Sequence, residues 1–103
     1  MAVKEITDNT FTDETSTGIV VIDFWAEWCG PCRILSPILE DLSKEMTNVQ
    51  FKKINVDENP IVAGSLGITA IPTVIIYKDG RPVERIVGLL PKEHIKKIIQ
   101  KQV

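Results

Sequence analysis

Apolar residues occupy nearly every position from Ile19 to Phe24, in a run rich in β-branched side chains. Such a run predicts a strand that is buried on both faces of a sheet. From Ile34 to Met46 apolar residues recur every three or four positions with charged residues between them, which predicts an amphipathic helix. Pro37 lies within this helix and has no N–H. We expect a kink there rather than an end, because the apolar stripe continues beyond it.

Shorter runs of the same two kinds divide the rest of the chain into strands and helices. The predicted strands lie at 3–6, 19–25, 50–57, 73–77 and 83–87. The predicted helices are a short one carrying Phe11, the segment after the second strand, 60–66, and one that Pro91 opens. Asp79-Gly80 is a strong signal for a hairpin between the last two strands. This order predicts an α/β fold, with a central mixed five-stranded β-sheet flanked by four α-helices on its two faces.

Polar residues mark the expected starts of two of these helices. Thr7-Asp8-Asn9 offers N-cap candidates for the helix carrying Phe11, although the threonines around it are poor helix formers. Asn59 is expected to cap the helix that begins with Pro60, since proline is favoured at the first helical position.

Composition and charge narrow the class of protein. The 103 residues predict one domain, 1–103, and 44% hydrophobic with 25% charged residues is ordinary for a globular protein. A net charge of −2 argues against a nucleic acid or an anionic membrane as partner. No apolar run approaches the roughly 20 residues of a membrane span. The segment from Met1 has no apolar stretch of signal-peptide length, so we expect a cytoplasmic protein.

Cys29 and Cys32 are the only cysteines, and they lie where the buried strand ends and the amphipathic helix begins. A disulfide between them closes a very short loop, which chain entropy values at roughly 2 kcal/mol. That is small beside the roughly 5–15 kcal/mol that stabilises a typical domain. The pair is therefore better explained by reactivity than by stabilisation.

The position of the cysteines suits thiol chemistry. A thiolate is the attacking species, and the unpaired N–H groups and positive dipole at a helix N-terminus favour negative charge on sulfur. We expect Cys29 to be exposed at this end and to attack, with Cys32 one turn further to resolve the product. Gly30 would allow a tight turn, and Pro31 is tolerated in the first turn, where its missing N–H costs nothing.

Asp23 interrupts the buried strand just before the cysteines. If it is buried, lost hydration raises its pKa toward neutrality, so that it could take the proton from Cys32. The alternative is a carboxylate at a strand end in contact with water. Lys53, on a strand expected nearby, is either the charge partner of Asp23 or part of a solvated strand face.

A cysteine pair also occurs in proteins of other classes. Structural zinc needs four ligands, and the chain has no second cysteine pair. The single histidine, His94, lies in a Lys-rich segment and is expected at the surface. A protein that only binds partners and catalyses no reaction would be indicated by the loss of one of the two cysteines. An oxidase or isomerase is not excluded by spacing alone. Trp25 is expected mainly to pack, and Trp28 to lie partly exposed beside the thiols.

Several motifs together carry a family resemblance. Residues 21–32 read Val-Ile-Asp-Phe-Trp-Ala-Glu-Trp-Cys-Gly-Pro-Cys, and Pro37, Ile71-Pro72-Thr73 and Gly88 follow. With these motifs the whole chain closely resembles the thioredoxin family. The resemblance implies the thioredoxin fold, a cis-proline at Pro72 opposite the cysteines, and a buried acid, Asp23, paired with Lys53. It also implies a flat apolar docking patch for substrate made by Trp28, Gly30, Pro31, Ile71, Pro72 and Gly88.

The resemblance further implies a protein-disulfide reductase that acts by dithiol–disulfide exchange through Cys29 and Cys32. Gly30-Pro31 between the cysteines resembles the reductase type. The implied partners are a flavin-containing, NADPH-dependent thioredoxin reductase and disulfide-containing client proteins. No bound cofactor and no metal are expected, and a monomer is expected. Arg33 stands where the family usually has lysine, Thr69-Ala70 replaces a variable pair, and the first helix is richer in threonine than usual.

Overall fold

Ile19–Trp25 forms a central strand that is hydrogen-bonded to a neighbouring strand on each edge in the computed structural model, which describes residues 3–103. Its burial on both faces follows from the continuous apolar run. The elements in chain order are β1 (Val3–Glu5), α1 (Phe11–Glu14), β2 (Ile19–Trp25), α2 (Gly30–Glu45), β3 (Gln50–Asn55), α3 (Pro60–Ser65), β4 (Thr73–Lys78), β5 (Arg81–Val87) and α4 (Lys92–Gln100).

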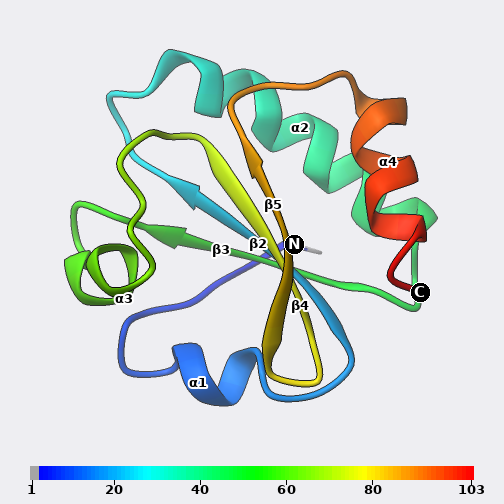
Figure 1. Cartoon of the computed structure of the whole chain (residues 1–103). Coiled ribbons are helices and arrows are strands. Elements are labelled where there is room, and N and C mark those ends of the chain that lie inside the picture. Colours follow the sequence, from blue (N-terminus) through cyan, green and yellow to red (C-terminus); the bar gives the residue numbers. More distant parts are fainter. Residues whose placement is uncertain (1–2) are drawn as a thin grey trace.

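The sheet has the strand order β1-β3-β2-β4-β5. β1, β3 and β2 run parallel to one another, whereas β4 is antiparallel to both of its neighbours, β2 and β5. Figure 1 shows α2 and α4 on one side of the sheet and α1 and α3 on the other. The predicted mixed five-stranded sheet with four helices is confirmed.

Two apolar layers enclose this sheet, and successive residues of β2 point into them alternately. Val21 belongs to the layer that contains the apolar stripes of α2 and α4, and Val20, Ile22 and Phe24 belong to the layer beneath α1 and α3. By this alternation the side chain of Asp23 points to the α2 side of the sheet. The position of Asp23 in the strand therefore directs its carboxylate towards the helix that begins at the cysteines.

The predicted boundaries hold for most elements and shift for some. α2 runs through Pro37 without ending, as expected. β3 stops at Asn55 instead of residue 57, and β5 begins at Arg81, so that it includes Pro82. Pro82 is tolerated because β5 is an edge strand. The expected domain 1–103 and the interpretation of the segment from Met1 also include residues 1 and 2, which lie outside the described residues. Among residues 3–103 no helix has the length and apolarity needed to cross a membrane.

The expected cap of the first helix was wrong, whereas Asn59 is the N-cap residue of the third helix as expected but makes no side-chain capping bond. α1 begins after Thr10, whose side chain makes no capping bond, and not after the segment 7–9. Asn59 precedes α3, but its side-chain oxygen accepts the N–H of Asp8. The Asp8 carboxylate caps α3 instead, accepting the N–H groups of Ile61 at 3.1 Å and Val62 at 3.0 Å. A cap supplied from a distant part of the chain is invisible to local sequence patterns.

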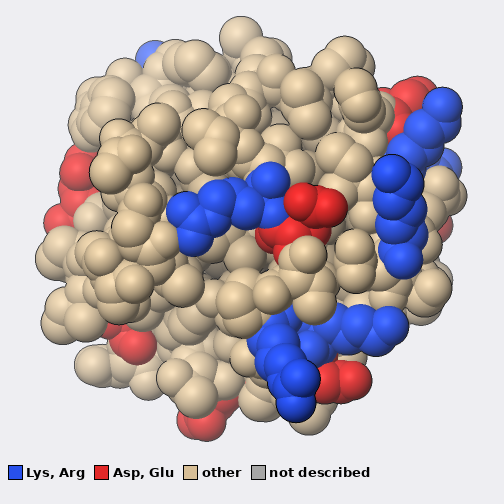
Figure 2. All heavy atoms as spheres, in the orientation of Figure 1, with Lys and Arg blue, Asp and Glu red and all other residues tan. Residues whose placement is uncertain are grey.

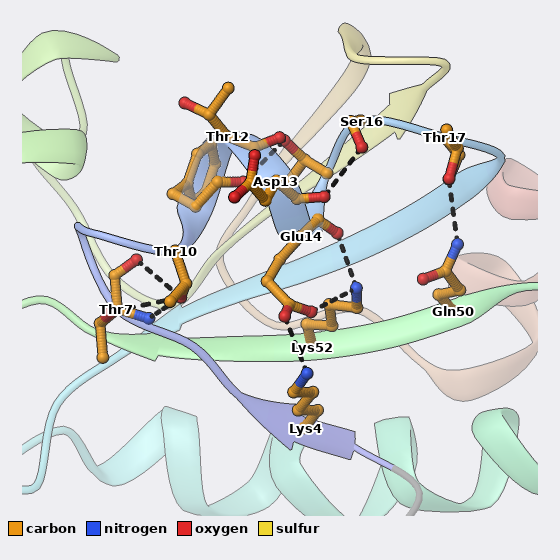
Figure 3. Close-up of polar contacts among 12 residues, drawn as sticks. Lys4, Thr7, Thr10, Thr12, Asp13, Glu14, Ser16, Thr17, Gln50 and Lys52 are labelled. Atoms are coloured by element: carbon orange, nitrogen blue, oxygen red, sulfur yellow. Dashed lines mark hydrogen bonds and ion pairs between the residues drawn. The ribbon is translucent and has the colours of Figure 1, made fainter.

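The short helix α1 is fastened to the sheet by the ion pairs of Glu14 (Figure 3). Lys52 of β3, only 8% exposed, donates to the Glu14 backbone carbonyl at 2.7 Å and to its carboxylate at 2.7 Å. Lys4 of β1 donates to the other carboxylate oxygen at 2.8 Å. These tertiary contacts offset the weak helix propensity of the threonine-rich segment. Hydrogen bonds from Lys4 and then Lys52 lower the pKa of Glu14 to about 2.

This network predicts an acid-dependent loss of stability. A carboxylate with a lowered folded-state pKa stabilises the fold above its unfolded value, 4.5, and loses that contribution as the pH falls towards about 2. Glu14→Gln should therefore be less stable than the wild type at neutral pH, and the difference should vanish near pH 2, measured by urea unfolding of the oxidised protein. The control is Asp13→Asn, because Asp13 makes no ion pair within residues 3–103. Parallel pH profiles for Glu14→Gln and the wild type would contradict the prediction.

Candidate active site

The two cysteines form a disulfide across the first turn of α2. Cys29 is the N-cap residue in extended conformation, Gly30 and Pro31 open the helix, and Cys32 follows, with 5.3 Å between the two cysteine Cα atoms. The Cys29 Sγ accepts the backbone N–H of Cys32 at 3.2 Å. The sulfur of Cys29 therefore takes the place of a capping oxygen at the positive end of the helix.

The expected exposure of Cys29 was wrong for this oxidised state. Cys29 is 2% exposed and Cys32 is 3% exposed. The Cys29 sulfur is bonded to Cys32, whose side chain faces inward, and it also takes the N–H at the helix end. Both interactions direct the sulfur along the helix and away from solvent.

Gly30 is not required by the backbone. It does not adopt a positive φ, and a Cβ at this position would meet no atom within 4 Å. The tight turn that Gly30 was expected to allow therefore makes no use of glycine's conformational freedom. Arg33, one residue after Cys32, donates to the backbone carbonyl of Glu27 at 2.7 Å and so braces the loop before the helix.

Asp23 is buried inside β2, with 3% of its surface exposed. Its Oδ1 has no hydrogen-bond partner in the described part of the chain. The carboxylate and Cys32 line the same cavity of about 120 Å³, which is large enough to hold water. The residues lining it are Asp23, Trp25, Ala26, Glu27, Cys32, Arg33, Ser36 and Lys53. This burial contradicts the alternative of a carboxylate at a strand end in open contact with water.

Burial raises the pKa of Asp23 to about 7. The positive charge of Lys53 opposes this rise, and the negative charge of Glu5 adds to it. A carboxyl group with a pKa near neutrality accepts and releases protons under physiological conditions. The site therefore contains a proton acceptor in the same cavity as the second cysteine.

Lys53 lies beside Asp23 but is held by other groups. The two residues are register partners on the adjacent strands β3 and β2. The ion pair that Lys53 makes is with Glu5, at 3.9 Å, and its Nζ lies 5.2 Å from the centroid of the Trp25 ring. The Trp25 Nε1 donates to Glu5 at 3.3 Å. The sequence-based reasoning missed Glu5, whose only signal was its place on the predicted edge strand 3–6.

The residues expected to bind substrate lie on three segments of the chain, 28–31, 71–72 and the position of Gly88. The Ile71–Pro72 peptide bond is cis, and the N–H of Gly88 donates to the carbonyl of Pro72 at 2.8 Å. Trp28, 69% exposed, is oriented by a hydrogen bond from its Nε1 to Asp57 at 2.9 Å. An open groove is lined by Trp28, Val56, Ala63, Ile68, Thr69, Ala70 and Ile71.

Charged side chains are unevenly spread over the face that Figure 2 shows. They are few over the loop before β4 and the start of α2, whereas Lys, Arg and acidic side chains gather over β5 and α4. His94 is exposed on α4, as expected. Within residues 3–103 no group of three or more His, Cys, Asp or Glu side chains is arranged to hold a metal ion.

Comparison with known proteins identifies the family. The family model described as Thioredoxin matches residues 2–101. The thioredoxin of Listeria monocytogenes serovar 1/2a is 52% identical over 102 residues, which cover 98% of this chain and 99% of that protein. The thioredoxin of Bacillus subtilis (strain 168) is 47% identical, and one from Staphylococcus aureus (strain MW2) is 40% identical, each over 98% of both chains.

The fold and the cysteine pair at the start of α2 define a thiol–disulfide oxidoreductase. The chain belongs to the thioredoxin family. It is a protein-disulfide reductase that works by dithiol–disulfide exchange through Cys29 and Cys32.

The buried acid predicts a measurable dependence of stability on pH. A carboxyl group whose pKa rises from 3.8 to about 7 on folding binds its proton more tightly in the native state. The free energy of unfolding of the oxidised wild type, relative to Asp23→Ala, should therefore fall by on the order of 3 kcal/mol as the pH rises from about 4 to about 7.

Chemical unfolding at several pH values measures this difference. The control is Asp41→Ala, which removes an exposed carboxylate from α2 and should show no such change. A difference between the wild type and Asp23→Ala that stays constant over this range would contradict the raised pKa.

Proposed function

We propose that Cys29 is the attacking thiol and Cys32 the resolving thiol. The proposal is supported by the N-terminal end of α2, where the Cys29 Sγ accepts the Cys32 N–H at 3.2 Å. In the dithiol state the same N–H and the helix dipole would stabilise a Cys29 thiolate. The thiolate attacks one sulfur of a client disulfide, forms the mixed disulfide and releases the other client sulfur as a thiolate.

We propose that Asp23 is the base for the second step. The single observation that carries this role is a buried carboxylate with an unpartnered oxygen in the cavity that Cys32 also lines. Asp23 takes the proton of Cys32, and the Cys32 thiolate attacks the Cys29 sulfur. The bond between Cys29 and the client breaks, the client sulfur leaves with the electron pair, and a proton completes its thiol. Two electrons have then passed from the cysteine pair to the client.

Substrate docking is assigned to the weakly charged surface beside the disulfide. Trp28 and Ile71 border the open groove, and Pro72 is joined to Gly88 by a backbone hydrogen bond. An open, largely apolar groove of this kind suits an extended client segment, because it buries apolar side chains without demanding a particular sequence.

The partners proposed for the chain are disulfide-containing client proteins and an NADPH-dependent thioredoxin reductase that restores the dithiol. Family membership over residues 2–101 supports these partners. It also supports a single domain, 1–103, that acts as a monomer and needs no bound cofactor. A reductant of client disulfides would work in the cytoplasm, where the thiol poise is reducing.

Single-cysteine variants test the two thiol roles. Cys32→Ser should accumulate mixed disulfides with an oxidised client, because the resolving thiol is missing. Cys29→Ser should not, because it lacks the attacking thiol. Non-reducing electrophoresis or intact mass spectrometry after incubation with a disulfide-containing client measures the trapped complex. Equal trapping by the two variants would overturn the assignment.

Asp23→Asn tests the base. The amide keeps the shape of the carboxyl group but cannot accept the Cys32 proton, so release of the client from the mixed disulfide should slow by at least about tenfold near neutral pH. Single-turnover kinetics measures release separately from the first attack, which should change little. Wild-type release rates for Asp23→Asn from about pH 6 to pH 8 would remove Asp23 from the mechanism.

A further inference from the structure

Three charged residues stand side by side across three parallel strands. Glu5 of β1 is the register partner of Lys53 of β3, and Lys53 is in turn the register partner of Asp23 of β2. Since adjacent strands lie about 4.8 Å apart, Glu5 and Asp23 are separated by about 10 Å with the lysine between them. The lysine is thus shared by a carboxylate at the edge of the sheet and one at its centre.

The positively charged Nζ of Lys53 is held on the Glu5 side of this row. Lys53 Nζ is 3.9 Å from the Glu5 carboxylate and 5.2 Å from the centroid of the Trp25 ring. The Trp25 Nε1 in turn donates to Glu5 at 3.3 Å and fixes its orientation. No ion pair within 4.0 Å joins Lys53 to Asp23 in the described structure.

We propose that Glu5 is a positioning residue for the exchange reaction: by holding Lys53 towards the edge of the sheet, it leaves Asp23 without a direct counter-charge and ready to accept the Cys32 proton. This inference rests on the proposed role of Asp23 as base. Trp25 completes the arrangement, since its ring faces the lysine and its N–H faces Glu5.

The electrostatics of the row agree with this role. Glu5 raises the pKa of Asp23, whereas Lys53 lowers it. The pKa of Glu5 is itself raised by burial, which the hydrogen bond from Trp25 and the charge of Lys53 oppose. The other titratable or charged groups that face these carboxyl groups are Cys32 and Arg33 of α2, Glu27 of the loop before it, and Glu58, which acts on Glu5.

The test is Glu5→Gln, in which the amide oxygen can still accept the Trp25 N–H but carries no charge. The pH midpoint of Asp23, read from the carboxyl carbon by NMR in the oxidised protein, should fall by about half to one pH unit. The pH profile of client release in single turnovers should move by the same amount towards lower pH. Glu58→Gln is the matched control, because it removes a nearby charge that acts on Glu5 but not on Asp23.

A double-mutant cycle tests whether Lys53 transmits the effect. In a Lys53→Met background, Glu5→Gln should lose at least about half of its effect on the Asp23 midpoint. An undiminished effect in that background, or an unchanged midpoint in Glu5→Gln alone, overturns the inference even if Asp23→Asn slows release. A midpoint that moves while the release profile does not overturns the base role of Asp23, and the positioning role with it.

Discussion

The central strand of the sheet buries a carboxylate, and the base role proposed for Asp23 depends on that burial. β2 is paired on both edges and covered on both faces, so a charged side chain within it loses most of its hydration. Asp23 remains in this position because its carboxylate opens into a cavity instead of a packed apolar layer. The same cavity reaches Cys32. The burial that is unfavourable for the fold therefore leaves a carboxylate in the cavity that Cys32 also lines, where the proposed mechanism needs a proton acceptor.

The N-terminal end of α2 has a different effect: it favours negative charge on the Cys29 sulfur. Cys29 is the residue that caps the helix, and its sulfur accepts the N–H of Cys32. The two thiols therefore differ through their surroundings. Cys29 is governed by the helix end, whereas Cys32 faces the buried acid. This difference is the physical basis for assigning attack to one cysteine and resolution to the other.

Two neighbouring lysines of β3, Lys52 and Lys53, interact with different parts of the protein. Lys52 and Lys53 point to opposite faces of β3, as successive strand residues must. Lys52 meets Glu14 and fastens α1 to the sheet, whereas Lys53 meets Glu5 and Trp25 next to the cavity. The first lysine serves stability. The second is proposed to serve the reaction through Glu5 and Asp23.

The sequence by itself determined the order and type of the elements, the position of the cysteine pair at a strand–helix junction, and the anomaly of Asp23 in an apolar run. These features are local: hydrophobic periodicity, turn residues and motif spacing are all read within a few residues. Only the tertiary structure decided which distant groups meet. The row formed by Glu5, Lys53 and Asp23 follows from strand order and register. The capping of α3 by Asp8 and the burial of Cys29 follow from contacts that the folded chain makes outside the sheet. Strand order and register arise from packing across the whole chain, and no local pattern specifies them.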